Sequence, residues 1–195
     1  MHHMKKKLID ITYDLLYKKG YCATNLNEIT AKAQITKGSL YYHFDSKHDL
    51  VLSSITYYLE YILYEFWVKP LQESQSPKET LTQQITRYQE VFRSGETLKI
   101  EHGCPLSNFI LDMSDKDEVF FSYLKSVYSR WHEALESALQ KAIELNQTQG
   151  SFDANDQALF IMSSIEGCIG SAKAYNDIKM LERGFSVLNT YIQDL

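Results

Sequence analysis

The chain has 195 residues, of which 44% are hydrophobic, and a formal net charge of −5. This size is sufficient for one or two domains with a hydrophobic core. Because only three prolines and eight glycines occur, whereas β-rich chains need turns about every 8–12 residues, we expect an all-α protein. No stretch approaches the roughly 18 uncharged apolar residues of a membrane span. The polar start Met1–Met4 is unlike a secretory signal, so we expect a cytoplasmic protein.

The cysteines indicate neither a disulfide framework nor a metal centre. Cys22, Cys104 and Cys168 are scattered and odd in number, which favours free thiols in a reducing compartment. The spacing of His102, Cys104 and His132 matches no standard set of metal ligands, so we expect no metal and no other cofactor. A cysteine-dependent enzyme is the alternative of a different class, but no third group orients His102 and Cys104 as base and nucleophile, so catalysis is not expected.

Apolar residues recur at helical spacing along nearly the whole chain. Gly20 is typical of the residue just past a helix C-terminus, and Asn25 with Glu28 has the spacing of a capping box. The polar segment 70–77 is the predicted connection between two parts of the chain. The resulting architecture has about nine helices, over residues 5–19, 26–33, 37–44, 46–69, 78–93, 105–112, 116–146, 153–175 and 177–194.

Charge is distributed unevenly along the chain. Residues 1–50 contain eight lysines and five acidic residues, a surplus of three positive charges, whereas residues 51–195 carry a net −8. A basic end on an acidic body is typical of a protein whose one end binds a polyanion. Solvated lysines would produce the same count, so charge leaves both interpretations open.

Two short predicted helices, joined by a tight turn and preceded by a supporting helix, describe a helix-turn-helix. The second short helix has to enter the major groove of DNA, and its N-terminus can offer backbone N–H groups to a phosphate. Here that end is Thr36-Lys37-Gly38-Ser39, which combines small residues with one cation. Leu40 and Phe44 are expected to face the core.

Three segments, Ala23-Thr24-Asn25-Leu26, Lys37-Gly38-Ser39-Leu40-Tyr41-Tyr42-His43-Phe44 and Ser46-Lys47, closely resemble the N-terminal domain of the TetR family of transcriptional regulators. The resemblance is ungapped over about residues 5–50. It implies base or phosphate contacts for the matching positions, although packing remains an alternative for Tyr41 and His43. These positions are Thr24, Asn25, Asn27, Thr36, Lys37, Gly38, Ser39, Tyr41, Tyr42, His43 and Lys47.

The resemblance also divides the chain into two domains. It implies a three-helix DNA-binding domain over residues 1–48 and a larger helical regulatory and dimerisation domain over residues 49–195. In such proteins the last two helices form a four-helix bundle with a second copy, although their apolar stripes could equally be intramolecular core. The residues assigned to the dimer interface are Leu159, Met162, Ile165, Ile169, Leu181, Phe185 and Leu188.

Aromatic residues crowd the middle of the chain. Such residues can line an apolar ligand pocket, but an aromatic stripe at helical spacing is also common in a plain core. The residues that we assign to a ligand pocket are Tyr61, Tyr64, Tyr88, Phe92, Phe109, Tyr128 and Trp131.

Gly103-Cys104 at the start of a helix resembles one branch of the family, which includes multidrug-type and electrophile- or oxidant-sensing members. In the electrophile-sensing members a lysine late in the penultimate helix accompanies the cysteine, and Lys173 matches that place. A helix N-terminus and a nearby ammonium would both lower the pKa of the Cys104 thiol. Cys104 with Lys173 is therefore a predicted sensor, and a purely structural cysteine is the alternative.

Taken with the resemblance, the residues predict a homodimeric repressor of transcription that binds a palindromic operator in double-stranded DNA. A small molecule, or modification of Cys104 by an oxidant or electrophile, would release it. An activator of the same architecture is the alternative, because the sign of regulation depends on where the operator lies.

Overall fold

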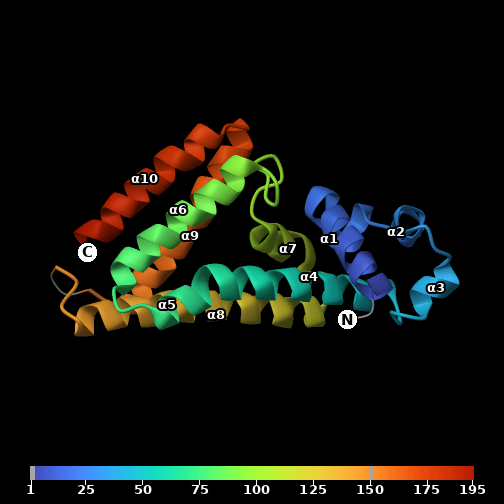
Figure 1. Ribbon diagram of the computed structural model, residues 1–195, viewed down its shortest axis with the longest axis horizontal. Helices are drawn as coiled ribbons and strands as arrows, with labels where there is room; N and C mark the ends of the chain where they lie inside the picture. The colour runs from blue at the N-terminus through green and yellow to red at the C-terminus, as the bar shows by residue number, and fades with distance from the viewer. Residues whose placement is uncertain (1–2, 150–151) are drawn as a thin grey trace. The chain divides into compact units, whose positions relative to one another are not determined.

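The computed structural model describes residues 3–149 and 152–195, which are helical apart from short connections and contain no β-strand (Figure 1). The all-α expectation is therefore confirmed. The chain separates into two compact units. Unit 1 ends at Tyr61 and also includes Asn108–Leu124, and unit 2 consists of Ile62–Ser107 and Lys125–Leu195. Within the described ranges, no helix has the length and apolar content to cross a membrane.

The observed helices start and end close to where local sequence signals place them. Asn25 accepts a hydrogen bond from the backbone N–H of Glu28 and so begins the second helix. The elements are α1 (His3–Ala23), α2 (Leu26–Ala33), α3 (Lys37–Tyr41), α4 (Lys47–Leu63), the π-helical turn η1 (Tyr64–Val68), α5 (Lys69–Glu73), α6 (Pro77–Ser94), α7 (Pro105–Met113), α8 (Glu118–Glu144), α9 (Ala154–Tyr175) and α10 (Ile178–Asp194).

The main difference lies at Pro70, where the sequence suggested a break. The chain instead stays helical to Glu73. Proline lacks the N–H that would bond to the carbonyl four residues earlier, and the helix adjusts just before it. Lys69 donates its N–H to the carbonyl of Tyr64, five residues back, which is a π-helical register. The expected connection therefore shortens to the few residues before Pro77.

The core of unit 1 holds α1, α2 and α3 together. Leu8 of α1, Ile29 of α2 and Leu40 of α3 are completely buried, and Phe44 joins them just after α3. The prediction that Leu40 and Phe44 are core residues is confirmed. Since α3 has only five residues, this burial and not its own hydrogen bonds stabilises its position.

The C-terminal end of α1 contacts the end of α7 within unit 1. Gly20 interrupts α1 with φ +79° and ψ 177°, a combination that only glycine adopts readily. The backbone N–H of the next residue, Tyr21, donates to Asp112 Oδ2 at 2.5 Å. A Cβ atom on Gly20 would lie 2.9 Å from that oxygen. The position therefore requires glycine both for its backbone angles and for space.

A second polar contact in unit 1 joins the first turn of α4 to the start of α8. His48 Nε2 lies 2.9 Å from Asp117 Oδ1, and the His48 ring stacks on Phe120 with 4.3 Å between centroids. Asp117 also accepts the N–H groups of Val119 and Phe120 and thereby caps α8. The hydrogen bond from His48 lowers the pKa of Asp117.

These contacts enlarge the N-terminal unit beyond what the sequence suggested. The sequence places a boundary at residue 48, but α4 belongs to unit 1 as far as Tyr61, and Asn108–Leu124 join it. Tyr58 of α4 adds a hydrogen bond to Asp10 of α1. A single boundary along the chain cannot include Asn108–Leu124, because this segment rejoins unit 1 after the chain has left it at Tyr61.

Unit 2 is built around α6, α9 and α10, and α10 packs against both of the others (Figure 1). The facing side chains are apolar and spaced three or four residues apart, as helix packing requires. Trp131 of α8 and Trp67 of η1 are both buried, with ring centroids 5.3 Å apart. Ile85, Ile165 and Phe185 are completely buried between the three helices.

Replacing Gly20 by alanine should destabilise the protein by about 1–3 kcal/mol, because the new Cβ meets Asp112 and the backbone angles disfavour it. Urea unfolding followed by circular dichroism measures this loss. Gly95→Ala is the matched control, since Gly95 also has a positive φ (+64°) but no atom lies within 4 Å of its Cβ position. Equal losses for the two variants would show that the contact with Asp112 contributes nothing.

Candidate functional site

The third helix, α3, is positioned as a rigid projection of unit 1. Thr36 caps its N-terminus by accepting the N–H of Ser39 at 3.2 Å. Its inner side is anchored by Leu40, and the helical hydrogen bonding continues through Phe44, whose N–H donates to the Leu40 carbonyl at 3.1 Å. Because the inner side is buried, the remaining side chains of the helix face solvent.

The solvent side of α3 carries most of the residues that the sequence assigned to DNA. Tyr42 is 84% exposed and Tyr41 is 50% exposed. Aromatic side chains exposed to this extent side by side are typical of an interaction surface. Lys37 is exposed, and the half-buried His43 ring lies edge-on to Tyr42 at 5.0 Å. The remaining positions of this set that face solvent are Asn25, Asn27, Thr36 and Gly38, with Ser39 half-buried.

Two of the assigned residues have structural contacts instead. Thr24 is completely buried, and its hydroxyl donates to the Gly20 carbonyl at 2.8 Å. Lys47 donates to the Tyr21 carbonyl at 2.9 Å and lies 4.2 Å above the Tyr21 ring, and burial lowers its pKa. Both groups bind the end of α1, and their phosphate contacts stay a prediction.

Sequence reasoning missed a lysine that stabilises the motif. Lys7 of α1 donates to the carbonyl of Ala33 at 2.8 Å. A cation at a helix C-terminus is favourable because it offsets the dipole and binds a free carbonyl. The residue lies within a run of three lysines, and its spacing alone does not distinguish it from a solvated neighbour.

Within unit 2, Cys104 lies at the start of α7 and is buried. Its thiol donates to Glu166 Oε1 of α9 at 3.2 Å, and the hydroxyl of Ser107 donates to Oε2 of the same carboxyl group. The Tyr88 hydroxyl of α6 lies 4.0 Å from the Cys104 sulfur. The half-buried carboxyl group of Glu166 thus joins α9 to the start of α7, with Tyr88 of α6 beside the thiol, and sequence reasoning missed this residue. A signal existed, since Glu166 is the only charged residue of α9 between Asp156 and Lys173.

The surroundings of Cys104 differ from those expected of a reactive thiol. Burial, followed by the nearby Glu166 carboxylate, raises its pKa well above the ordinary value, against the opposing effect of backbone N–H groups at the helix start. The Lys173 ammonium donates to the His102 carbonyl at 3.1 Å. The expectation of a lowered pKa is thus corrected, because the thiol is paired with an acid in a dry environment.

The aromatic residues assigned to a ligand pocket divide between the two units. Tyr88, Phe92 and Trp131 are buried in unit 2, where Tyr88 lies 5.4 Å from Phe92, and Tyr128 lies 6.2 Å from Trp131. The indole Nε1 of Trp131 is buried, and no described residue forms a hydrogen bond with it. The others do not join this cluster: Phe109 packs on Tyr13 in unit 1, Tyr61 of unit 1 is exposed, and Tyr64 of unit 2 is exposed.

The residues assigned to a dimer interface are mostly core residues of unit 2. Leu159 is half exposed and Leu188 is nearly buried. The other five are at most 1% exposed, because α9 and α10 turn these stripes toward each other and toward the rest of the unit. They are Met162, Ile165, Ile169, Leu181 and Phe185.

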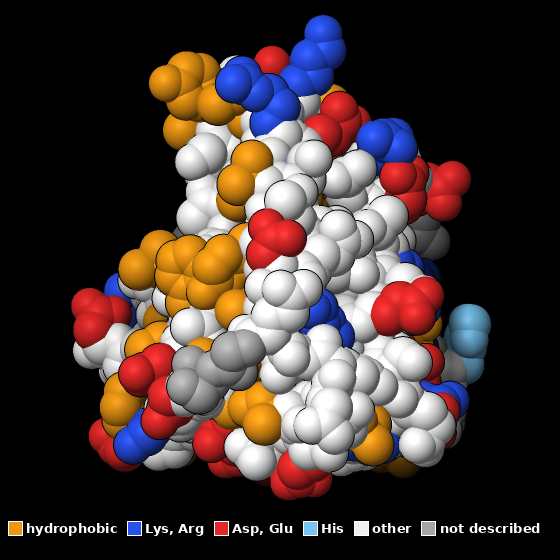
Figure 2. All heavy atoms as spheres, turned by 90° about the vertical axis from the view of Figure 1, so that its left-hand side faces the viewer, with side chains coloured by type: hydrophobic (Ala, Val, Ile, Leu, Met, Phe, Trp, Pro, Cys, Tyr) orange, Lys and Arg blue, Asp and Glu red, His pale blue; other side chains and the backbone are white. Residues whose placement is uncertain are grey.

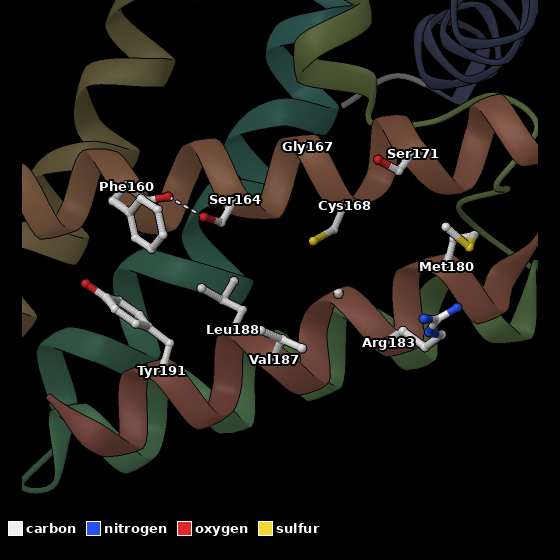
Figure 3. Close-up of a pocket in the computed structure, with 11 residues that line it drawn as sticks. Phe160, Ser164, Gly167, Cys168, Ser171, Met180, Arg183, Val187, Leu188 and Tyr191 are labelled. Atoms are coloured by element: carbon white, nitrogen blue, oxygen red, sulfur yellow. Dashed lines mark hydrogen bonds between the residues drawn. The ribbon is translucent and has the colours of Figure 1, made fainter.

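A different face of α9 and α10 is open. It forms a groove of about 640 Å³ in which side chains of the two helices point toward each other (Figure 3). The Phe160 and Tyr191 rings lie 5.0 Å apart, and Val187 is 71% exposed. On the face drawn in Figure 2, the larger hydrophobic patches lie toward the left of the view. The groove is lined by Phe160, Ser164, Gly167, Cys168, Ser171, Met180, Arg183, Gly184, Val187, Leu188 and Tyr191.

Both parts of the chain match family models. Residues 8–53 match the model described as bacterial regulatory proteins, tetR family, and residues 78–188 match the tetracyclin repressor-like, C-terminal domain. The chain therefore belongs to the TetR family of DNA-binding transcriptional regulators and is not an enzyme.

A regulator of Lactococcus lactis encoded in the lacX 3′ region, itself uncharacterized, is 28% identical over 195 residues, which cover 97% of this chain and 93% of the relative. IcaR of Staphylococcus aureus strain Newman, described as a negative transcriptional regulator of the biofilm operon icaADBC, is 42% identical over 59 residues, covering 30% of this chain and 32% of IcaR.

Solved structures share the fold at low identity. Reduced NemR of Escherichia coli has a TM-score of 0.83 at 20% identity and covers 96% of this chain and 95% of its own. A TetR regulator of Chloroflexus aurantiacus has a TM-score of 0.85 at 24% identity, covering 97% and 93%.

Thiol alkylation tests the corrected view of Cys104. With N-ethylmaleimide under native conditions, Cys22 should react fastest because it is exposed, and Cys104 slowest because it is buried with a raised pKa. Mass spectrometry of peptides at successive times gives the three rates, and unfolding in urea should make them similar. A Cys104 that reacts as fast as Cys22 would restore it as the reactive sensor.

Proposed function

We propose that the chain is a homodimeric repressor that binds a palindromic operator through α3 and is released by a ligand bound in unit 2. The observation that carries the DNA-binding role is the solvent face of α3, where Lys37, Tyr41 and Tyr42 project from a helix anchored by Leu40. Repression is favoured over activation because the similar protein IcaR is a negative transcriptional regulator.

The groups on this face suit both kinds of DNA contact. The Lys37 ammonium and the N-terminus of α2, capped by Asn25, can bind phosphates and thereby orient the unit. Tyr41, Tyr42 and His43 can reach base edges and the thymine methyl group in the major groove. Phosphate contacts would provide affinity, and base contacts would provide the choice of sequence.

Lys37→Ala and Tyr42→Ala should each weaken operator binding, while leaving the fold intact because both side chains are exposed. Fluorescence anisotropy on an operator selected from random duplexes measures the affinity at several salt concentrations. Loss of one phosphate contact at Lys37 should reduce the slope of log affinity against log salt by about 0.9.

Lys18→Ala is the matched control, since Lys18 is exposed on α1 and pairs with Asp14. It removes the same charge from the same unit away from α3. Unchanged affinity in both α3 variants would contradict the placement of the recognition surface.

For the dimer, the groove between α9 and α10 is the proposed contact. Its lining follows helical spacing on both helices, and no atom lies within 4 Å of the Cβ position of Gly167, which leaves room for another pair of helices. Gly184 instead allows the close approach of Cys168 within the same chain. A second copy placed against it by a two-fold axis would complete a four-helix bundle, and the two α3 helices would then reach successive turns of the duplex, about 34–36 Å apart.

Val187→Glu should convert the dimer to monomers, because it places a charge in the apolar groove without disturbing the core. Analytical ultracentrifugation over a range of concentrations measures the dissociation constant. Ser186→Glu, on the same helix, exposed, and absent from the groove lining, should leave the dimer intact. A variant at Val187 that stays dimeric would contradict this interface.

For release, α7 is the proposed transmitting element, because it is one continuous helix and the division between the units falls between Ser107 and Asn108. Its first residues bind Glu166 in unit 2, and Asp112 near its end binds the Tyr21 N–H in unit 1. A ligand that prefers one arrangement of α7 would shift the population of DNA-binding and released states by its differential affinity.

Modification of Cys104 is the second candidate signal. Added bulk on its sulfur would disrupt the hydrogen bonds to Glu166 at the same place. The raised pKa favours a noncovalent ligand as the primary signal. If the Cys104→Ala variant still leaves the operator when hypochlorite is added, the thiol is not the sensor.

A further inference from the structure

Glu166 is an acidic residue inside unit 2 for which residues 3–149 and 152–195 provide no basic partner. Its carboxyl oxygens accept hydrogen bonds from the Cys104 thiol and the Ser107 hydroxyl. Burial raises its pKa from the ordinary value. The ionised form of such a carboxyl group is costly without a cation, and the described part of the chain supplies no cation for it.

The neighbours of this carboxyl group are aromatic. Tyr88 lies next to the Cys104 sulfur, and the Tyr128 ring lies 6.2 Å from that of Trp131. Burial, followed by the charge of Glu166, raises the pKa of Tyr128. One helical turn beyond Tyr128, the Trp131 ring is 3% exposed and its Nε1–H has no acceptor. Three helices, α6, α8 and α9, thus bring an acid, two phenol rings and an indole together in one unit.

Several groups of this cluster can form further interactions with a ligand. A carboxylate offers about four lone-pair positions, and two of them are occupied here. The faces of tyrosine and tryptophan rings attract cations, and the unpaired indole N–H can donate to an acceptor on a ligand. Lys173, the other charged residue in the C-terminal part of α9, directs its ammonium to the His102 carbonyl.

From these features we infer that the effector of this regulator is an organic cation, an amine or ammonium compound with an aromatic body, held by Glu166 among Tyr88, Tyr128 and Trp131. This inference rests on the proposed function, in which unit 2 binds the releasing ligand, and it assigns the chemical class of that ligand. The Glu166 carboxylate would repel an anionic ligand, and a neutral ligand would leave its negative charge without a counter-charge.

Isothermal titration calorimetry with phenethylammonium and 2-phenylethanol tests the assignment, because the two probes share one body and differ in charge. Wild-type protein should bind the ammonium more tightly than the alcohol. Glu166→Gln should reduce ammonium affinity by about tenfold to a hundredfold and leave the weak binding of the alcohol unchanged. Glu182→Gln is the matched control, since Glu182 lies on α10 and pairs with the exposed Arg93.

The pH dependence provides a second measurement that needs no variant. Phenethylammonium keeps its charge between pH 5 and pH 8, whereas Glu166, whose pKa is raised, gains its charge as the pH rises. Ammonium affinity should therefore increase with pH in the wild type and stay flat in Glu166→Gln. Thermal melts of both proteins establish that the variant is folded, and the wild-type profile decides the matter if it is not.

The outcomes separate this inference from the proposed function. Equal binding of the two probes, no binding of the ammonium at millimolar concentration, or a Glu166→Gln variant that binds like the wild type would each overturn the cation assignment. Operator binding measured on the same wild-type sample tests the repressor role by itself. If the protein binds DNA but not the ammonium, only the cation assignment is contradicted. If it binds the ammonium but no DNA, only the proposed function is contradicted.

Discussion

Burial of Leu40 and Phe44 is the constraint on which the DNA-binding face depends. A five-residue helix has too few internal hydrogen bonds to persist in water, and α3 keeps its form because these two side chains complete the core made by Leu8 and Ile29. The anchoring determines which residues face outward. Tyr42 is left exposed because the helix has only one side that can be buried.

Within the same unit, polar contacts join segments that are far apart in the sequence, and at Gly20 the contact leaves no space for a side chain. Gly20 allows Asp112 to approach the Tyr21 N–H, and Asp117 both caps α8 and binds His48. Thr24 and Lys47 also bind the end of α1, so groups that could have contacted phosphate serve to orient the helix-turn-helix. The contact with Asp112 also fixes the end of α1 against the C-terminal end of α7 within unit 1.

Unit 2 contains a polar group where a purely structural core would have an apolar one. Glu166 and the indole N–H of Trp131 both lack full compensation, and such groups lower stability. A ligand-binding site needs such incompletely paired polar groups, because groups that are fully hydrogen-bonded within the protein cannot bind a ligand. Glu166 also lies beside the first turn of α7. The destabilising group is therefore in contact with the helix that continues into unit 1.

The sequence by itself determined the helices, their caps and the family. Asn25 and Glu28 begin α2 through contacts only three residues apart, so the signal is local and readable. The segment from Lys37 to Phe44 identified the helix-turn-helix, and Leu40 and Phe44 were assigned to the core correctly. The break expected at Pro70 is wrong because a π-helical turn just before the proline accommodates the missing hydrogen bond.

Only the tertiary structure decided how the side chains are paired. Helical spacing shows that a stripe is apolar, but it does not distinguish a stripe buried within the chain, such as Ile165 and Phe185, from one left open, such as Phe160 and Val187. Cys104 was matched with Lys173 on position, whereas its partner is Glu166, 62 residues away. Contacts over such separations depend on how helices pack against one another, and a pattern that repeats every three or four residues contains no record of that arrangement.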